Sequence, residues 1–192
     1  IYYAHMPDYD TPLDETLRAM DDLVRQGKVR YLGCSNYRAF QVAQALWISD
    51  VQKLARWDIV QPPFNLLARE IEYELLPLCV EEGVGVAAFS PLAAGFLSGK
   101  YEAGKPAPAD QRFGLGPRGF RYNEKYWTDL DFAAVERLKQ IAADHGMPLD
   151  RFALAWVLRK PGITAIVCGS TAAEQIDRNV AAVGVRLAPE AL

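Results

Sequence analysis

Small uncharged polar side chains follow short apolar runs at several points of this 192-residue sequence. They are Ser35, Asn36, Gln61, Asn65, Ser90, Ser170 and Thr171, and His5 follows the first such run. Hydroxyl and amide groups both donate and accept hydrogen bonds, so this set suits a neutral polar ligand. A metal ion would instead need clustered His, Cys or carboxylate ligands.

The elements that must position these side chains alternate along the chain. Short apolar runs predict strands at residues 1–4, 29–32, 58–61, 84–89 and 164–167. Helical spacing of apolar residues predicts one helix between an N-cap at Thr11 and a C-cap at Gly27, and others at residues 39–47, 70–82, 130–144, 149–159 and 172–183. Parallel strands need crossover connections, so this alternation predicts a parallel α/β sheet, in a doubly wound fold or a (β/α) barrel. In both folds the chemistry lies at the carboxyl ends of the strands.

Local signals refine this plan. Pro12 is expected at the first position of its helix, and Pro77 is expected to kink the helix at 70–82 because it has no backbone N–H. Thr171 and Glu174 have the spacing of a capping box. The Gly- and Pro-rich stretch 103–119 predicts a long loop, which is the usual kind of place for a functional lid.

Composition narrows the class of partner. Hydrophobic residues make up 51% of the chain and the net charge is -3, so a substantial core is expected and nucleic acid is not. The most apolar stretch is broken by Ser90, Pro91 and glycines and is too short to span a membrane. Residues 1–10 lack the features of a signal peptide. The three cysteines lack metal-ligand spacing, which predicts reduced thiols and a cytoplasmic location.

Four motifs occur in register behind YYAHMPD at residues 2–8. They are GCSNY at 33–37, QPPFNLL at 61–67, FSPLAAGFLSGKY at 89–101 and CGSTAAEQIDRN at 168–179. In this order and spacing they closely resemble the C-terminal part of aldo-keto reductases, in the branch of bacterial general aldo-keto reductases and potassium-channel β subunits. The resemblance implies a TIM (β/α)8 barrel, of which residues 1–192 would form the C-terminal five or so βα units as a single domain. Residues 101–127 would then be a long loop over the cofactor and substrate side.

The resemblance assigns the first motifs to a nicotinamide cofactor. Ser35, Asn36 and Gln61 match residues that hydrogen-bond the nicotinamide carboxamide, and Phe89 matches the aromatic residue that stacks on its ring. An amide has a donor side and an acceptor side, which these side chains can satisfy. The alternative is that Ser35 and Asn36 cap the next helix, and that Phe89 belongs to the core.

The phosphates are expected further along the chain. By resemblance Ser90, Leu92, Gly95 and Lys100 bind the pyrophosphate, and Arg112 falls where a loop arginine of the channel-subunit branch lies. On the alternative interpretation, Lys100 and Arg112 are solvated surface charges. Residues 169–171 precede a helix, whose N-terminus is suited to anions, and this adds Gly169, Ser170 and Thr171 to the phosphate residues.

The adenosine end is assigned to the last helix. Gln175 and Asn179 match residues that contact adenosine, and Arg178 stands where relatives often carry Glu. Arg178 could bind a 2′-phosphate or point to solvent. Gly169 and Gln175 are uncharged where NADP-selective relatives often carry Lys or Arg. NADP is the expected cofactor, with NAD as the alternative.

His5 is the one match to the family's catalytic group. The family also uses a Tyr as general acid, with a Lys and an Asp that lower its pKa, and these come from strands and loops that precede this sequence. Five strands cannot close an eight-stranded barrel, so two edges would stay open. We therefore expect either a longer polypeptide or a second chain that supplies the missing strands.

These observations predict an oxidoreductase that reduces small aldehydes or ketones to alcohols with NADP(H). A cofactor-sensing regulatory subunit, like the potassium-channel β subunits, is the alternative from another class. A third alternative is a half-barrel that is inactive by itself.

Overall fold

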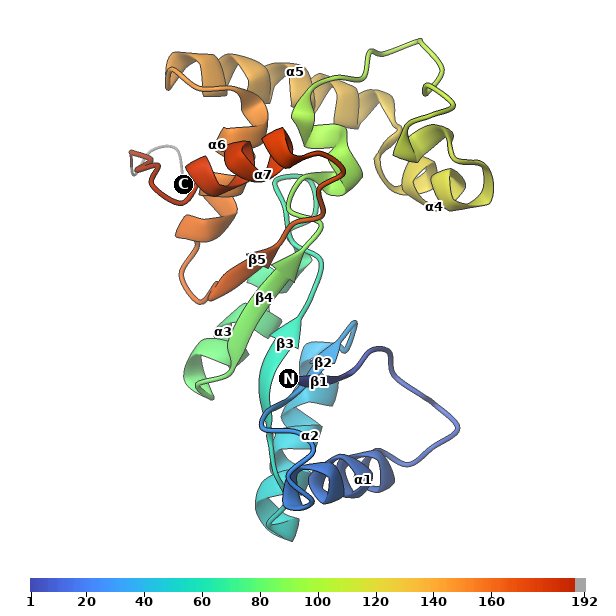
Figure 1. Ribbon diagram of the computed structural model, residues 1–192, viewed down its shortest axis with the longest axis vertical. Coiled ribbons are helices and arrows are strands. Elements are labelled where there is room, and N and C mark those ends of the chain that lie inside the picture. The colour runs from blue at the N-terminus through green and yellow to red at the C-terminus, as the bar shows by residue number, and fades with distance from the viewer. Residues whose placement is uncertain (189–192) are drawn as a thin grey trace. The chain divides into compact units, whose positions relative to one another are not determined.

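The computed structural model describes residues 1–188, which form two compact units (Figure 1). Unit 1 comprises Ile1–Pro63, Glu70–Phe89 and Pro161–Ala165. Unit 2 comprises Phe64–Arg69, Ser90–Lys160 and the described residues from Ile166 onward.

Strands alternate with helices along the chain, as predicted. The strands are β1 (Tyr2–Ala4), β2 (Leu32–Ser35), β3 (Trp57–Gln61), β4 (Gly85–Phe89) and β5 (Ala165–Val167). They form one sheet in the order β1-β2-β3-β4-β5, in which β1 and β2, β2 and β3, and β3 and β4 pair in parallel. The predicted α/β class is confirmed, and this strand order is consistent with part of a (β/α)8 barrel.

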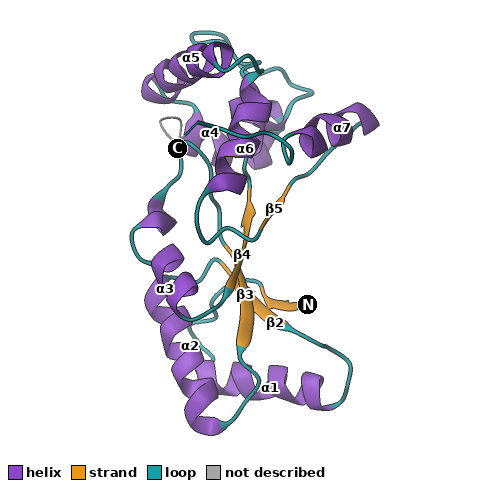
Figure 2. Cartoon of the chain, turned by 90° about the vertical axis from the view of Figure 1, so that its left-hand side faces the viewer, coloured by secondary structure: helices purple, strands orange, loops and turns teal. Residues whose placement is uncertain are grey.

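Seven α-helices and three short 3₁₀ segments are found among the described residues. The helices are α1 (Leu13–Arg25), α2 (Ala39–Gln52), α3 (Leu75–Glu81), α4 (Gly116–Tyr126), α5 (Asp129–Asp144), α6 (Leu149–Arg159) and α7 (Ala173–Ala181). The 3₁₀ segments are η1 (Glu70–Glu72), η2 (Ala93–Ser98) and η3 (Arg112–Gly114). Within unit 1, α1 packs against α2 and α2 against α3 (Figure 2). No helix in the described part of the chain is both long enough and apolar enough to cross a bilayer.

Strand β2 differs from its prediction because small residues lie inside it. The predicted strand 29–32 ends where the observed strand begins, and all four residues of β2 are buried. Gly33 lies between Tyr3 on β1 and Ile59 on β3. A Cβ atom at this position would come within 2.6 Å of the Ile59 carbonyl oxygen and 2.8 Å of the Tyr3 ring. Only glycine allows the three strands to approach so closely.

The ends of α1 differ in part from their prediction. Its N-cap is Pro12 rather than Thr11, because the Thr11 hydroxyl donates instead to Asp8 Oδ2 at 2.7 Å. The helix does end before Gly27, which has φ 70° and donates its N–H to the Val24 carbonyl. A positive φ at this place is what makes glycine the usual terminating residue.

The predicted helix 70–82 is two elements in the structure. The 3₁₀ segment η1 precedes α3, in which Pro77 is the third residue. The first turn of a helix leaves its backbone N–H groups without intrahelical partners, so proline is tolerated there. The kink predicted at Pro77 is therefore wrong, because the helix starts just before it.

Unit 2 is built on aromatic side chains. The ring of Phe96 lies 5.0–5.9 Å from the rings of Tyr101, Phe113, Trp127 and Phe132. This packing organises much of the stretch 101–127, which contains η3 and the eleven-residue helix α4. The predicted long loop is therefore limited to residues 101–111, which carry no helix or strand. Residues 112–114 and 116–126 are helical, because buried aromatic residues outweigh the low helix propensity of the glycines.

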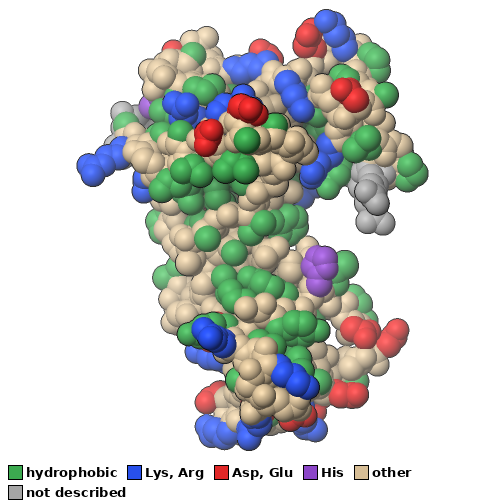
Figure 3. All heavy atoms as spheres, viewed as in Figure 1, with side chains coloured by type: hydrophobic (Ala, Val, Ile, Leu, Met, Phe, Trp, Pro, Cys, Tyr) green, Lys and Arg blue, Asp and Glu red, His purple; other side chains and the backbone are tan. Residues whose placement is uncertain are grey.

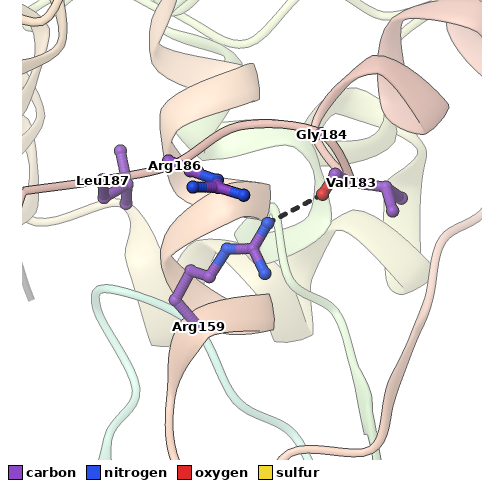
Figure 4. A pocket seen from close by; sticks show the side chains of 5 residues that line it. All are labelled: Arg159, Val183, Gly184, Arg186 and Leu187. Atoms are coloured by element: carbon purple, nitrogen blue, oxygen red, sulfur yellow. Dashed lines mark hydrogen bonds between the residues drawn. The ribbon is translucent and has the colours of Figure 1, made fainter.

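The C-terminal part of unit 2 is held by Arg159 at the end of α6. Its guanidinium donates to the carbonyl oxygen of Val183 at 2.8 Å (Figure 4) and to that of Val185. At the other end of α7 the predicted capping box is wrong, because the N-cap is Ala172. Gln175 Oε1 accepts the Thr171 N–H at 2.8 Å, so a different side chain satisfies this terminus.

Candidate cofactor-binding residues

The carboxyl ends of β2 and β3 bring two predicted residues together. Ser35 ends β2, Gln61 ends β3, and the two are register partners. Ser35 is buried, and its hydroxyl donates to the Gln61 carbonyl oxygen at 2.7 Å. Phe89 ends the next strand, β4, where it bridges to Pro63 and is half-buried. Three of the predicted nicotinamide residues therefore end adjacent strands of unit 1.

Asn36 links this edge to the end of β1. Its Nδ2 donates to the His5 carbonyl oxygen at 2.9 Å and to Ser35 Oγ at 3.1 Å. Its backbone has φ 64°, a left-handed conformation that asparagine adopts more readily than most residues. The amide side chain thus fixes the loop after β1 beside the loop after β2.

Helix capping is not the role of Ser35 or Asn36. The N-cap of α2 is Arg38, whose N–H is accepted by Gln41 Oε1 at 2.9 Å. The capping alternative for these two residues is therefore wrong. Among the described residues, no hydrogen bond occupies Asn36 Oδ1 or the side-chain amide of Gln61, which leaves an acceptor and further donors for a ligand.

His5 lies directly after β1, with its backbone carbonyl held by Asn36 and its side chain exposed. The next residues are also fastened, since the Tyr37 hydroxyl donates to the Met6 carbonyl oxygen at 3.3 Å. The structure thus brings His5 to the same strand ends as Ser35, Asn36 and Gln61.

In unit 2, the predicted pyrophosphate residues follow β4 in a turn of unusual backbone. Ser90, Ala93, Ala94 and Gly95 all have positive φ, from 48° to 96°. The carbonyl oxygen of Leu92 accepts the Gly95 N–H at 2.8 Å, which closes part of this turn. Such conformations are costly for residues other than glycine, and they persist where the surrounding structure fixes them.

The two predicted phosphate-binding cations rest on aromatic rings. Lys100 Nζ lies 5.1 Å from the Tyr101 ring centroid, and the Arg112 guanidinium lies 5.7 Å from that of Tyr122. Lys100 also adjoins Gly95, where an added Cβ would lie 4.0 Å from Nζ. Burial raises the pKa of the Tyr101 hydroxyl, and the charge of Arg112 partly opposes this.

The predicted residues of the last motif gather at the N-terminus of α7. Gln175 Oε1 accepts from Thr171, and Asn179 Nδ2 donates to Ser170 Oγ at 3.2 Å. Gly169 and Arg178 are exposed. No hydrogen bond or ion pair between described residues joins this set to the turn at Ser90.

Asn65 is a polar residue that the sequence interpretation did not place among the cofactor residues. It is fully buried, and its side chain hydrogen-bonds Ser90, Tyr126 and Leu67. The available signal was an asparagine inside the apolar motif QPPFNLL, since buried amides are usually held in specific networks.

Other chemistry finds less support in the described residues. They include no group of three or more His, Cys, Asp or Glu residues that could hold a metal ion. Burial raises the pKa of Cys34, and raises that of Cys79 to about 11, so neither thiol is a nucleophile at neutral pH.

Acidic and basic side chains are mixed on the face seen in Figure 3. A pocket of about 480 Å³, lined by Arg159, Val183, Gly184, Arg186 and Leu187, contains no predicted site residue.

Comparison with known proteins identifies the family. The sequence model described as "Aldo/keto reductase family" matches residues 1–192. The chain belongs to the aldo/keto reductase family. This confirms the resemblance on which the site residues were assigned, and membership supports an oxidoreductase.

Curated relatives of this chain include proteins with different names. The chain is 37% identical over 186 residues to a "Probable voltage-gated potassium channel subunit beta" of Arabidopsis thaliana, covering 96% of this chain and 56% of the relative. It is 34% identical to the "L-glyceraldehyde 3-phosphate reductase" of Escherichia coli (strain K12), covering 95% of this chain and 52% of the relative. It is 30% identical to the "NADH-specific methylglyoxal reductase" of the same strain, covering 97% and 55%. The chain thus spans about half the length of the curated relatives it matches.

Proposed function

We propose that this chain carries nicotinamide-cofactor residues of an aldo/keto reductase that reduces small aldehydes or ketones with NADP(H). The observation that carries the proposal is the linked set of Ser35, Asn36 and Gln61 at adjacent strand ends, with His5 beside them. A carboxamide offers one acceptor and two donors, and the unoccupied groups of Asn36 and Gln61 complement both.

Each residue has a distinct role in the proposal, and that of Ser35 is to hold Gln61 and Asn36 through its hydroxyl. Asn36 Oδ1 accepts from the carboxamide NH₂, and the Gln61 amide donates to its oxygen, which together fix the ring face that meets the substrate. Phe89 provides a flat surface for the ring. When bound, the cofactor supplies the hydride that reduces the carbonyl carbon. The exposed His5 ring donates to the carbonyl oxygen and orients it.

Residues of unit 2 bind the charged part of the cofactor in this proposal. The turn at Ser90, Leu92 and Gly95 presents backbone groups, and Lys100 and Arg112 add positive charge. Gly169, Ser170 and Thr171, before the N-terminus of α7, also bind phosphate. Gln175 and Asn179 bind the adenosine side, and Arg178 pairs with a 2′-phosphate. The relative named as NADH-specific keeps NAD as the alternative cofactor.

The substrate and the setting are also proposals. The two relatives named as reductases of L-glyceraldehyde 3-phosphate and methylglyoxal support a small aldehyde as the substrate. We propose a cytoplasmic protein that completes its barrel with further strands, from its own polypeptide or from a second chain. The relative named as a probable potassium channel subunit beta supports a second function, that of a regulatory subunit that senses the cofactor.

The test is a fluorescence titration of the 192-residue chain with NADPH and with NADH. We expect NADPH to bind more tightly, and we expect Gln61→Ala to weaken binding about tenfold, which corresponds to one lost hydrogen bond of about 1.4 kcal/mol. Gln44→Ala is the matched control, because Gln44 is exposed on α2 away from the strand ends. Equal affinities of the two variants would overturn the carboxamide assignment.

Reduction of DL-glyceraldehyde by the full-length protein that contains this chain, followed by the absorbance of NADPH, separates the two functions. Turnover supports the reductase. Tight NADPH binding without turnover favours the sensing subunit, and absence of binding by the chain favours the inactive half-barrel.

A further inference from the structure

Asn65 is the most completely bonded buried side chain near the proposed cofactor residues. Its exposed fraction is 0%. Oδ1 accepts the Leu67 N–H at 2.9 Å, and Nδ2 donates to the Ser90 carbonyl oxygen at 3.0 Å and to the Tyr126 hydroxyl at 3.2 Å. Its backbone N–H and C=O both pair with Ala68 at 3.1 Å. A residue held on all these sides has a fixed orientation, and it imposes that orientation on its partners.

The first partner is the turn that begins at Ser90. Ser90 has φ 54°, and two further non-glycine residues of the turn, Ala93 and Ala94, also have positive φ. The Ser90 carbonyl oxygen accepts both Asn65 Nδ2 and the Ala93 N–H, the latter at 2.9 Å. This one carbonyl oxygen therefore both closes the turn and anchors it to Asn65. Without the anchor, the strained backbone has less to hold it in place.

The second partner is the end of α4. Tyr126 is the last residue of this helix, and only 3% of it is exposed. Its hydroxyl accepts from Asn65, while its ring belongs to the buried aromatic cluster of unit 2. One side-chain amide thus joins the Ser90 turn to a helix that lies more than twenty residues further along the chain.

We propose that Asn65 is a positioning residue that holds the Ser90 turn ready for an anionic, phosphate-bearing ligand and couples this turn to α4 through Tyr126. The phosphate oxygens of the ligand contact backbone groups of the turn. The affinity for the ligand therefore depends on the turn having one conformation. Ligand binding at the Ser90 turn therefore also reduces local unfolding of α4. This inference rests on the proposed function, in which the turn binds the cofactor's pyrophosphate.

The variants that test it change single hydrogen-bonding groups. Asn65→Asp keeps the size and the acceptor for Leu67 but removes both donors, and Tyr126→Phe removes only the hydroxyl. Tyr122→Phe is the matched control on the same helix, because the Tyr122 hydroxyl has no hydrogen bond among the described residues and phenylalanine keeps the ring that Arg112 covers.

The measurement is hydrogen exchange by mass spectrometry, with inorganic pyrophosphate and NADPH as probes, together with the Kd of each. In the unchanged chain we expect both probes to slow exchange in residues 90–98 and in residues 116–126. In Tyr126→Phe the protection of 90–98 remains and that of 116–126 is lost. In Asn65→Asp the Kd of both probes rises about tenfold, as expected for a lost positioning hydrogen bond. In Tyr126→Phe, ligand protection of residues 90–98 without protection of residues 116–126 shows that the two segments are coupled through the hydroxyl. A general loss of stability would instead reduce the protection of both segments.

Each outcome decides the inference separately from the proposed function. If the unchanged chain binds pyrophosphate with the expected pattern but does not bind NADPH, the inference stands and the cofactor proposal fails. If it binds NADPH and both variants match Tyr122→Phe in Kd and in exchange, the cofactor proposal stands and the inference is overturned. If neither probe binds, both proposals are overturned.

Discussion

Asp21 provides the sharpest test of the energetics of unit 1. It lies on α1, and its side chain is only 8% exposed. Its Oδ1 accepts the Ala55 N–H at 2.8 Å, and its Oδ2 accepts from Arg25 Nε. The carboxylate therefore fastens α1 to the segment between α2 and β3. The perturbation is Asp21→Ala, which removes the acceptor and leaves the Ala55 N–H without its partner.

The expected cost follows from these contacts. A hydrogen bond to a charged group contributes about 1.5–3 kcal/mol, and leaving a buried donor unsatisfied costs a similar amount. We expect Asp21→Ala to lower the free energy of unfolding by about 2–3 kcal/mol. The matched control is Asp50→Ala on α2, whose ion pair with Lys53 has both side chains more than 80% exposed. Exposed pairs contribute little, so its cost is expected to be below about 0.5 kcal/mol.

The cost also depends on pH, with a definite sign. Burial raises the pKa of Asp21, but the hydrogen bonds from Ala55 and Arg25 outweigh it, so the pKa in the folded chain lies below the ordinary 3.8. A carboxylate with a lowered pKa stabilises the folded state fully above its unfolded pKa. That contribution declines as the pH falls through the folded pKa. The difference between the unchanged chain and Asp21→Ala is therefore constant near neutral pH and shrinks below about pH 4.

Urea denaturation followed by far-UV circular dichroism measures both quantities. At neutral pH the midpoint of Asp21→Ala is expected to fall by about 1 M relative to the unchanged chain. A loss as small as that of Asp50→Ala would refute the assignment of Asp21 as an anchor. A loss that stays undiminished under acid conditions would refute the assignment of its stabilising form as the carboxylate.

Two further substitutions test the packing. Gly33→Ala is expected to destabilise the chain by about 1–3 kcal/mol in thermal or urea unfolding, because a new Cβ would overlap a backbone oxygen of β3 and the ring of Tyr3. Gly184→Ala, where an added Cβ meets nothing within 4 Å, is its control, and an equal cost would contradict the proposed fit between the strands. Phe96→Ala is expected to cost about 3–5 kcal/mol through the cavity it leaves. Phe120→Ala should cost less than about 0.5 kcal/mol because that side chain is 61% exposed, and a similar loss in both would show that the aromatic cluster is not the core of unit 2.

The order of elements could be read from the sequence, but some boundaries could not. Apolar runs and helical spacing identified all five strands and the helices other than α4. Strand β2 was displaced because residues 29–31, of which Arg30 and Tyr31 are exposed, look more strand-like than the buried small residues that follow them. The need for Gly33 is visible only when β1 and β3 are placed on either side.

Helix α4 shows how tertiary packing can outweigh local propensity. Its sequence contains two glycines and a proline, which predict a loop. Pro117 was nevertheless a usable signal, since proline favours the first positions of a helix. What sequence patterns could not supply was the burial of Phe113 and Tyr126, on which the local fold depends.

The sequence motifs predicted which residues belong to the candidate site, but not the contacts that those residues make. Matching strand ends placed Ser35, Asn36 and Gln61 correctly at the edge of the sheet. Their hydrogen bonds to carbonyl oxygens of neighbouring strand ends depend on register, which no single motif contains. Asn65 was named among the polar residues that follow apolar runs, but its contacts could not be predicted because Ser90 and Tyr126 are distant in sequence.

The three cysteines can serve as internal probes of conformational opening. Cys34 and Cys79 are buried in unit 1, and Cys168 is half-buried in unit 2, where burial raises its pKa to about 11. A thiol reagent reacts with the thiolate, so a shielded and protonated thiol is modified mainly when its surroundings open. The alkylation rate of each cysteine, followed by peptide mapping, would thus measure how fast each unit opens, without an added label.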